Sequence, residues 1–136
     1  LVGSEMCIRD RGNRFLLSPL ETRRFLDEIG SDYVGMYLDV GNAVYIGYPE
    51  QWIEILGHRI KKLHMSDYRF DQAGIGAFVD LFAGDVDFPA VAKAIAGIGY
   101  DDYITLEMLP NYKQFPEVSL YADKYAMNKI IEMIHL

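Results

Sequence analysis

The stretch that decides the fold is Ile60-Lys61-Lys62-Leu63-His64-Met65-Ser66-Asp67. Its first six residues place β-branched and apolar side chains around two lysines, a pattern typical of a strand, and a Ser-Asp loop follows. Parallel strands of α/β proteins have this pattern, and their chemistry lies at their carboxyl ends. The sequence therefore predicts a parallel strand with a histidine at its functional end.

Two further strand-like runs end in an acidic residue. Tyr37-Leu38 is followed by Asp39, and Ile104-Thr105-Leu106 is followed by Glu107. Because the carboxyl ends of neighbouring parallel strands meet at one edge, Asp39, His64 and Glu107 are expected to converge on one point. Two carboxylates and an imidazole are a usual ligand set for a divalent cation, and these residue types leave Mn²⁺, Mg²⁺, Co²⁺ and Zn²⁺ all open.

Each of the three residues also has a simpler interpretation. Asp39 could cap a helix or turn together with Asn42, His64 could be a core histidine bonded to a carbonyl, and Glu107 could be a surface glutamate. A carboxylate at the edge of so apolar a strand is costly, however, unless it is paired or bound to a metal. The combination therefore favours a metal site over three separate explanations.

The composition narrows the class of partner. The 136 residues, 51% hydrophobic and 24% charged, suffice for one modest core. A net charge of -7 disfavours nucleic acid, because neutralising phosphates needs a basic surface. No apolar run approaches the roughly 18 residues that span a bilayer, so no membrane contact is expected. Cys7 is the only cysteine, which excludes an internal disulfide and favours a cytoplasmic location.

Helical and strand patterns alternate along the chain. Capping and breaker residues predict helices over 18–30, 49–57, 87 to 97 or 99, and 117–134, and strands over 33–40, 60–65 and 102–107. The long connection 66–86 is typical of a functional loop or lid, with a short helix expected over 77–82. Three parallel strands with outer helices cannot close a barrel. The expected fold class is α/β, the C-terminal half of a (β/α)₈ TIM barrel.

Residues 1–11, LVGSEMCIRDR, resemble the translation of a sequencing-library adapter, the transposase-end oligonucleotide. Such a segment contains no information about the fold of the native protein, and a natural N-terminus is the alternative. Residues 12–136 are then expected to be the C-terminal part of a single barrel domain.

Four motifs resemble the xylose-isomerase-like superfamily of sugar isomerases and epimerases. They are Asp39-Val40-Gly41-Asn42, His64-Met65-Ser66-Asp67, Gly84-Asp85-Val86-Asp87-Phe88, and Gly99-Tyr100 leading to Glu107. The likeness is nearest to the branch of L-ribulose- and L-xylulose-5-phosphate 3-epimerases, also known as hexulose-6-phosphate isomerases. Residues 13–110 carry this resemblance.

The resemblance implies a ligand set of Glu, Asp, His and Glu, with Mn²⁺ as the first choice of metal. Asp39, His64 and Glu107 match the last three ligands, and the first glutamate would stand just upstream of Asn13. Glu107 would also be catalytic, as one of two glutamates that move a proton between opposite faces of the substrate through an enediolate. The implied substrate is a ketose phosphate.

The residues beside the ligands are expected to contact this substrate. Asn42, Asp67 and Arg69 could bind sugar hydroxyls or phosphate, and the guanidinium of Arg69 suits phosphate because it offers a bidentate fork. Solvated loop positions are the alternative for all three. Ser66 departs from the family, which often has a lysine there.

The expected function of the parent protein is therefore that of a metal-dependent ketose-phosphate 3-epimerase or isomerase, acting as a homo-oligomer. Alternatives within the superfamily are a hydroxypyruvate isomerase, an inosose dehydratase and an abasic-site endonuclease, the last disfavoured by the acidic charge. A non-catalytic binding protein, in which the three ligands never meet, is the alternative from another class. The isolated chain is expected to be an inactive fragment.

Overall fold

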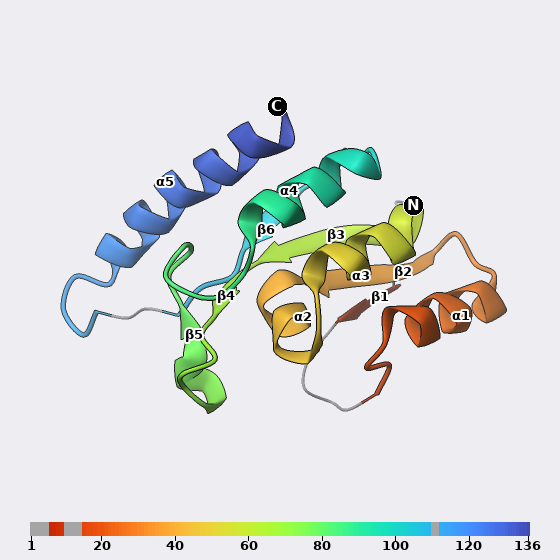
Figure 1. The fold of residues 1–136 in the computed structure, drawn as a ribbon, viewed down its shortest axis with the longest axis horizontal. Helices are drawn as coiled ribbons and strands as arrows, with labels where there is room; N and C mark the ends of the chain where they lie inside the picture. Colours follow the sequence, from red (N-terminus) through yellow and green to blue (C-terminus); the bar gives the residue numbers. More distant parts are fainter. Residues whose placement is uncertain (1–5, 10–14, 110–111) are drawn as a thin grey trace.

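A computed structural model describes residues 6–9, 15–109 and 112–136. Four parallel strands form its main sheet: β1 (Met6–Arg9), β2 (Val34–Asp39), β3 (Ile60–Met65) and β6 (Ile104–Leu106), in that order. Each crosses to the next through helices (Figure 1). This is the parallel α/β arrangement of an incomplete TIM barrel, so the expected fold class is confirmed.

Five α-helices in the described residues accompany the sheet, and Figure 1 shows their arrangement. They are α1 (Pro19–Ile29), α2 (Val40–Ile46), α3 (Pro49–Leu56), α4 (Phe88–Gly97) and α5 (Glu117–Ile134). Helices α1, α3, α4 and α5 pack side by side in that order. The core between helices and strands is apolar, and its largest fully buried side chains include Trp52, Phe88, Leu38, Ile53, Leu56 and Leu63. Burial of these side chains fixes the faces that the strands and helices present to one another.

The strand register aligns the carboxyl ends of β2, β3 and β6. Asp39 pairs with His64, and His64 pairs with Thr105. The backbone N–H of Glu107 donates to the carbonyl of Met65 at 2.9 Å, which continues the ladder one residue beyond β6. Three chemically active residues therefore leave the sheet at nearly the same level.

The connection after β3 is ordered rather than open. It contains β4 (Asp67–Tyr68), the 3₁₀ helix η2 (Gly74–Ala77) and β5 (Phe78–Val79), and β4 pairs antiparallel with β5. The helix expected over 77–82 is wrong, because Phe78–Val79 is taken into this two-stranded sheet.

Two local expectations also differ from the structure. Ser18 precedes α1 in an extended conformation, but its side chain makes no capping hydrogen bond; its carbonyl accepts from the N–H of Thr22 at 2.9 Å instead. Helix α2 was not expected, and it begins directly after Asp39. Of the adapter-like segment 1–11, only Met6–Arg9 is described, and its backbone pairs with β2. Its foreign origin stays a prediction.

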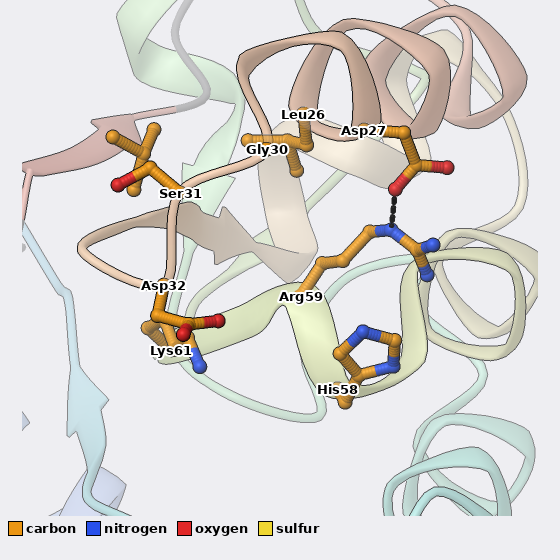
Figure 2. Close-up of a pocket in the computed structure, with 9 residues that line it drawn as sticks. Leu26, Asp27, Gly30, Ser31, Asp32, His58, Arg59 and Lys61 are labelled. Carbon is orange, nitrogen blue, oxygen red and sulfur yellow. Dashed lines mark hydrogen bonds and ion pairs between the residues drawn. The ribbon is translucent and has the colours of Figure 1, made fainter.

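A hollow of about 290 Å³ lies at the amino ends of β2 and β3, away from the carboxyl edge (Figure 2). It is bordered by the end of α1 and by the 3₁₀ helix η1 (Gly57–Arg59), and Arg59 Nε donates to Asp27 Oδ1 at 2.6 Å beside it. No helix in the described part of the chain is long and apolar enough to cross a membrane.

Candidate metal centre

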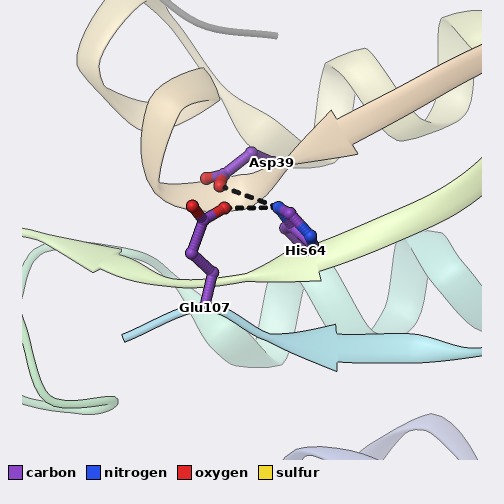
Figure 3. A group of neighbouring side chains, drawn as sticks. All are labelled: Asp39, His64 and Glu107. Atoms are coloured by element: carbon purple, nitrogen blue, oxygen red, sulfur yellow. Dashed lines mark ion pairs between the residues drawn. The ribbon is translucent and has the colours of Figure 1, made fainter. Parts of the chain in front are cut away.

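Asp39, His64 and Glu107 converge at the carboxyl edge of the sheet, each from a different strand end (Figure 3). One candidate ligand atom from each lies within 4.8 Å of the other two. They are separated by 25 and 43 residues in the sequence, so only the parallel sheet brings them together. The alternative in which the three groups never meet is therefore excluded. Their role as metal ligands stays a prediction.

The imidazole of His64 faces both carboxylates through one nitrogen. Nδ1 lies 3.6 Å from Asp39 Oδ2 and contacts Glu107 Oε2 directly. The ring is packed against Tyr37, with centroids 4.1 Å apart and planes tilted by 58°, and the residue is only 7% exposed. Nδ1 makes no hydrogen bond of good geometry within the described part of the chain. A nitrogen held in this way toward two carboxylates suits a cation placed between them.

Asp39 is both a helix cap and a member of this cluster. Its Oδ1 accepts from the N–H of Asn42 at 2.9 Å and from Ser66 Oγ at 2.6 Å. The alternative of a cap with Asn42 is thus realised together with the cluster, because the two oxygens of one carboxylate serve different partners. Burial favours the neutral carboxyl, but the neighbouring His64 imidazole and the hydrogen bonds from Ser66 and Asn42 outweigh it and hold the pKa of Asp39 below its ordinary value.

A pocket of about 350 Å³ opens beside the cluster. Its polar wall contains Asp39, Asn42 and Glu107, and its apolar wall contains Ile75, Phe78, Val79, Met108 and Leu109. The side chain of Glu107 is 33% exposed, so it can reach a molecule in the pocket. A concave site with a few convergent polar groups and an apolar wall is the usual form of a small-molecule site.

Asp67 does not line this pocket, contrary to the expectation of a substrate contact. It is fully buried, and its carboxylate accepts from the N–H groups of Tyr68 at 2.9 Å, Gly84 at 2.8 Å and Val86 at 3.2 Å. Burial raises the pKa of Asp67, and these backbone hydrogen bonds oppose the shift without cancelling it. The residue instead ties β4 to the end of the loop that forms the pocket wall.

Arg69 does not line the pocket either. Its guanidinium forms a two-point ion pair with Asp71, at 3.1 Å from Nε and 2.7 Å from Nη2. Both side chains of this pair are largely exposed, as the alternative of a solvated loop position predicts for Arg69. Of the three expected substrate contacts, only Asn42 lies at the pocket.

Ser66 is the site residue that the sequence analysis missed. The family resemblance distinguishes Ser66 only as a departure from the family, yet the residue is 3% exposed and bonded to Asp39. The alternation of side chains along a strand contains a usable signal, because residues two apart point to the same face. Ser66 follows His64 by two, so it was placed to face the same cluster.

The sequence matches the family described as "Xylose isomerase-like TIM barrel" over residues 5–127. Among solved structures, the IOLI protein with a zinc atom is 19% identical with a TM-score of 0.71, covering 83% of this chain and 43% of that one. A D-tagatose 3-epimerase-like protein is 18% identical with a TM-score of 0.76, covering 96% and 48%.

A xylose isomerase-like TIM barrel protein from Mycobacterium smegmatis, in complex with magnesium, is 17% identical with a TM-score of 0.69, covering 96% and 45%. The chain thus spans less than half the length of these structures. No curated protein matches the sequence significantly. The family match extends over most of the chain, and the parallel strands agree with it: the chain belongs to the xylose isomerase-like TIM barrel family.

Proposed function

We propose that this chain is part of a divalent-metal-dependent sugar epimerase or isomerase. The observation that carries the proposal is the cluster of Asp39, His64 and Glu107 at the carboxyl edge of the sheet, beside a pocket of about 350 Å³. In barrels of this kind, active sites lie at the carboxyl ends of the strands. The pocket is on that edge, whereas the hollow near Arg59 is at the opposite end.

The donor set fits a divalent cation. Two carboxylates and one neutral imidazole nitrogen supply two negative charges and three donor atoms, and the fourth protein ligand implied by the family would come from sequence before Asn13. A bound divalent cation would supply Lewis acidity toward the carbonyl and hydroxyl oxygens of a ketose, which makes the adjacent C–H proton more acidic. Mn²⁺ is the proposed metal, and similar structures with zinc or magnesium support the divalent class.

The residues of this chain divide the work of the reaction. Glu107, with its side chain partly exposed at the pocket, removes or returns the proton at the substrate carbon as general base and acid. Asn42 offers an amide at the same pocket for a sugar hydroxyl. The apolar wall of Ile75, Phe78 and Val79 limits the access of water to the reacting carbon. Asp39 and His64 act as ligands of the divalent metal.

A phosphorylated ketose is the finer proposal for the substrate. The ion pair of Arg69 with Asp71 bears on it, because the guanidinium would have to leave this carboxylate to bind phosphate. Comparing the reaction rates with a ketose and with the corresponding ketose phosphate tests whether the substrate is phosphorylated. An Arg69→Ala variant that keeps full preference for the phosphate would remove Arg69 from the proposal.

The test of the reaction uses a longer protein that includes the sequence before Asn13. We expect it to exchange the C3 proton of a ketose or ketose phosphate with D₂O solvent only when a divalent metal is present. Glu107→Gln should lower the exchange rate by about 10²–10⁴-fold, the usual contribution of a positioned general base. Lys129→Ala, at a distant exposed site on α5, is the matched control. Metal-independent exchange, or full exchange by the glutamine variant, would contradict the proposal.

We further propose that the parent protein is cytoplasmic and homo-oligomeric, and that the chain of 136 residues alone lacks epimerase activity. The reason for the last point is that the family resemblance implies two glutamates on opposite faces of the substrate carbon, and Glu107 is the one glutamate in the cluster formed by the described residues. Measured turnover by this chain would show that the second glutamate is not required.

A further inference from the structure

We infer that Ser66 is a positioning residue that presents Asp39 to the metal through a single oxygen, Oδ2. This inference rests on the proposed function, because it concerns the same site. The hydroxyl of Ser66 touches neither the pocket nor the other two ligands in the contacts described here. It acts through Asp39.

The two hydrogen bonds of Ser66 fix the direction of its hydroxyl. Its oxygen accepts from the N–H of Gly41 at 3.1 Å, and its hydrogen is donated to Asp39 Oδ1 at 2.6 Å. A backbone amide can only donate and an ionised carboxylate can only accept, so the order of donors is unambiguous. With 3% exposure, water does not compete for either bond.

These bonds divide the carboxylate of Asp39 into two different oxygens. Oδ1 accepts from Ser66 and from the N–H of Asn42 at 2.9 Å, while Oδ2 faces His64 Nδ1 at 3.6 Å. An oxygen that already accepts two hydrogen bonds is a poor additional ligand, whereas Oδ2 is directed into the cluster. Asp39 is therefore expected to bind an ion through one oxygen rather than two.

Gly41 makes room for this arrangement. A Cβ atom at position 41 would lie 2.4 Å from Ser66 Oγ, a distance at which the site would have to move, and 3.3 Å from the N of Asp67, a tight contact. The start of α2 and the end of β3 therefore approach each other closely, and the Ser66 hydroxyl fills the small gap between them. The first turn of α2 thus gains an acceptor for its Gly41 amide from the residue that directly follows β3, in addition to its Asp39 cap.

The competing explanation is that Ser66 serves only the stability of α2. The two explanations differ in metal affinity at temperatures well below unfolding. Partners that orient a metal ligand typically contribute 10- to 100-fold in affinity, because a freed carboxylate must be ordered again on binding. A purely structural cap would leave the affinity of the folded chain unchanged.

The experiment is titration of the metal-free chain with Co²⁺, followed by calorimetry and by visible absorption. We expect Ser66→Ala to weaken Co²⁺ binding by about 10- to 100-fold and to change the absorption intensity, since Asp39 becomes free to bind through both oxygens. Ser66→Thr keeps the hydroxyl and should retain most of the affinity. Ser119→Ala is the matched control, because Ser119 is equally buried and its Oγ has no hydrogen-bond partner within the described residues.

A second measurement needs no metal. Amide exchange by NMR should show faster exchange at Asn42 in Ser66→Ala, because the Asp39 carboxylate that accepts from this amide is no longer held. Unchanged Co²⁺ affinity in the alanine variant, or equal losses in the alanine and threonine variants, would overturn the inference. If neither the wild-type chain nor the longer protein used to test the reaction binds a divalent metal, the proposed metal site fails. In that case, unchanged exchange at Asn42 would independently overturn the role of Ser66.

Discussion

An added methyl group at Gly84 should strongly destabilise the loop that forms the wall of the pocket. A Cβ atom there would lie 2.2 Å from Asp67 Oδ1, 2.6 Å from Asp67 Cγ and 2.7 Å from the carbonyl oxygen of Tyr68. Two of these atoms belong to a buried carboxylate and one to the backbone, so none is the free end of a flexible side chain. The loop must move for Gly84→Ala to be accommodated.

The magnitude follows from what this movement breaks. Overpacking of a well-packed site costs about 1–3 kcal/mol. Displacing the N–H of Gly84 from Asp67 removes a hydrogen bond to a charged group, which contributes about 1.5–3 kcal/mol. Against this, alanine stabilises by about 0.4–1 kcal/mol relative to glycine through the unfolded chain. We therefore expect a net loss of about 1.5–5.5 kcal/mol in the free energy of unfolding, measured by urea denaturation.

Gly76→Ala is the matched control in the same loop. No atom lies within 4 Å of a Cβ built at Gly76, and its backbone is not in the left-handed region. This variant should lie within about 1 kcal/mol of the wild type, on the stabilising side if anything, because only the unfolded chain is affected. Equal stabilities of the two variants would refute the argument that Asp67 and Gly84 anchor the pocket wall.

Three further predictions concern the metal, the pH dependence and the core. A divalent metal at about 100 times its dissociation constant should raise the free energy of unfolding by about 2.7 kcal/mol, reversibly with EDTA, and His64→Ala should abolish this gain in a thermal-shift assay. Burial raises the pKa of Asp123, helped by the nearby charges of Asp80 and Asp67 and opposed by the N–H of Leu81, so its neutral form is favoured on folding. Its contribution to stability is complete below the ordinary pKa and is lost as the pH rises through the raised value. In urea titrations, the stability of the wild type relative to Asp123→Asn should therefore fall as the pH rises above the ordinary pKa of an aspartic acid, and a rise would contradict the assignment. Leu63 lies on β3 and its side chain is fully buried. Leu63→Ala should lower the free energy of unfolding by about 2–5 kcal/mol in urea denaturation, and a loss below about 1 kcal/mol would show that the site collapses to fill the cavity.

The strands and most of the helices could be predicted because their signals are local. Ile60–Met65 and Glu117–Ile134 have the bounds that apolar pattern and breaker residues indicate. Helix α2 was not predicted because it follows β2 without any intervening loop. A single residue, Asp39, ends the strand and caps the helix. The helix expected over 77–82 was wrong because pairing of β5 with β4 depends on residues ten and twelve positions away.

The residues of the candidate site could likewise be predicted only where local patterns indicate their positions. Asp39, His64 and Glu107 could be expected to meet because each follows a strand pattern, and parallel strands share one edge. Asp67 and Arg69 could not be placed, because the direction of a side chain in a long loop depends on distant partners. For Asp67 these partners are the amides of Gly84 and Val86, and no local pattern around position 67 indicates them.

The sequence by itself determined the class of fold and the three residues that converge. Hydrophobic periodicity, and the succession of strand and helix patterns along the chain, depend only on the order of the residues. Only the tertiary structure decided which oxygen of Asp39 is held by Ser66 and which faces His64. It alone also showed that Asp67 supports the pocket wall rather than lining the pocket. The physical reason is that hydrogen-bond partners are chosen by distances of a few tenths of an ångström between segments far apart in sequence, and these distances exist only after the core has packed.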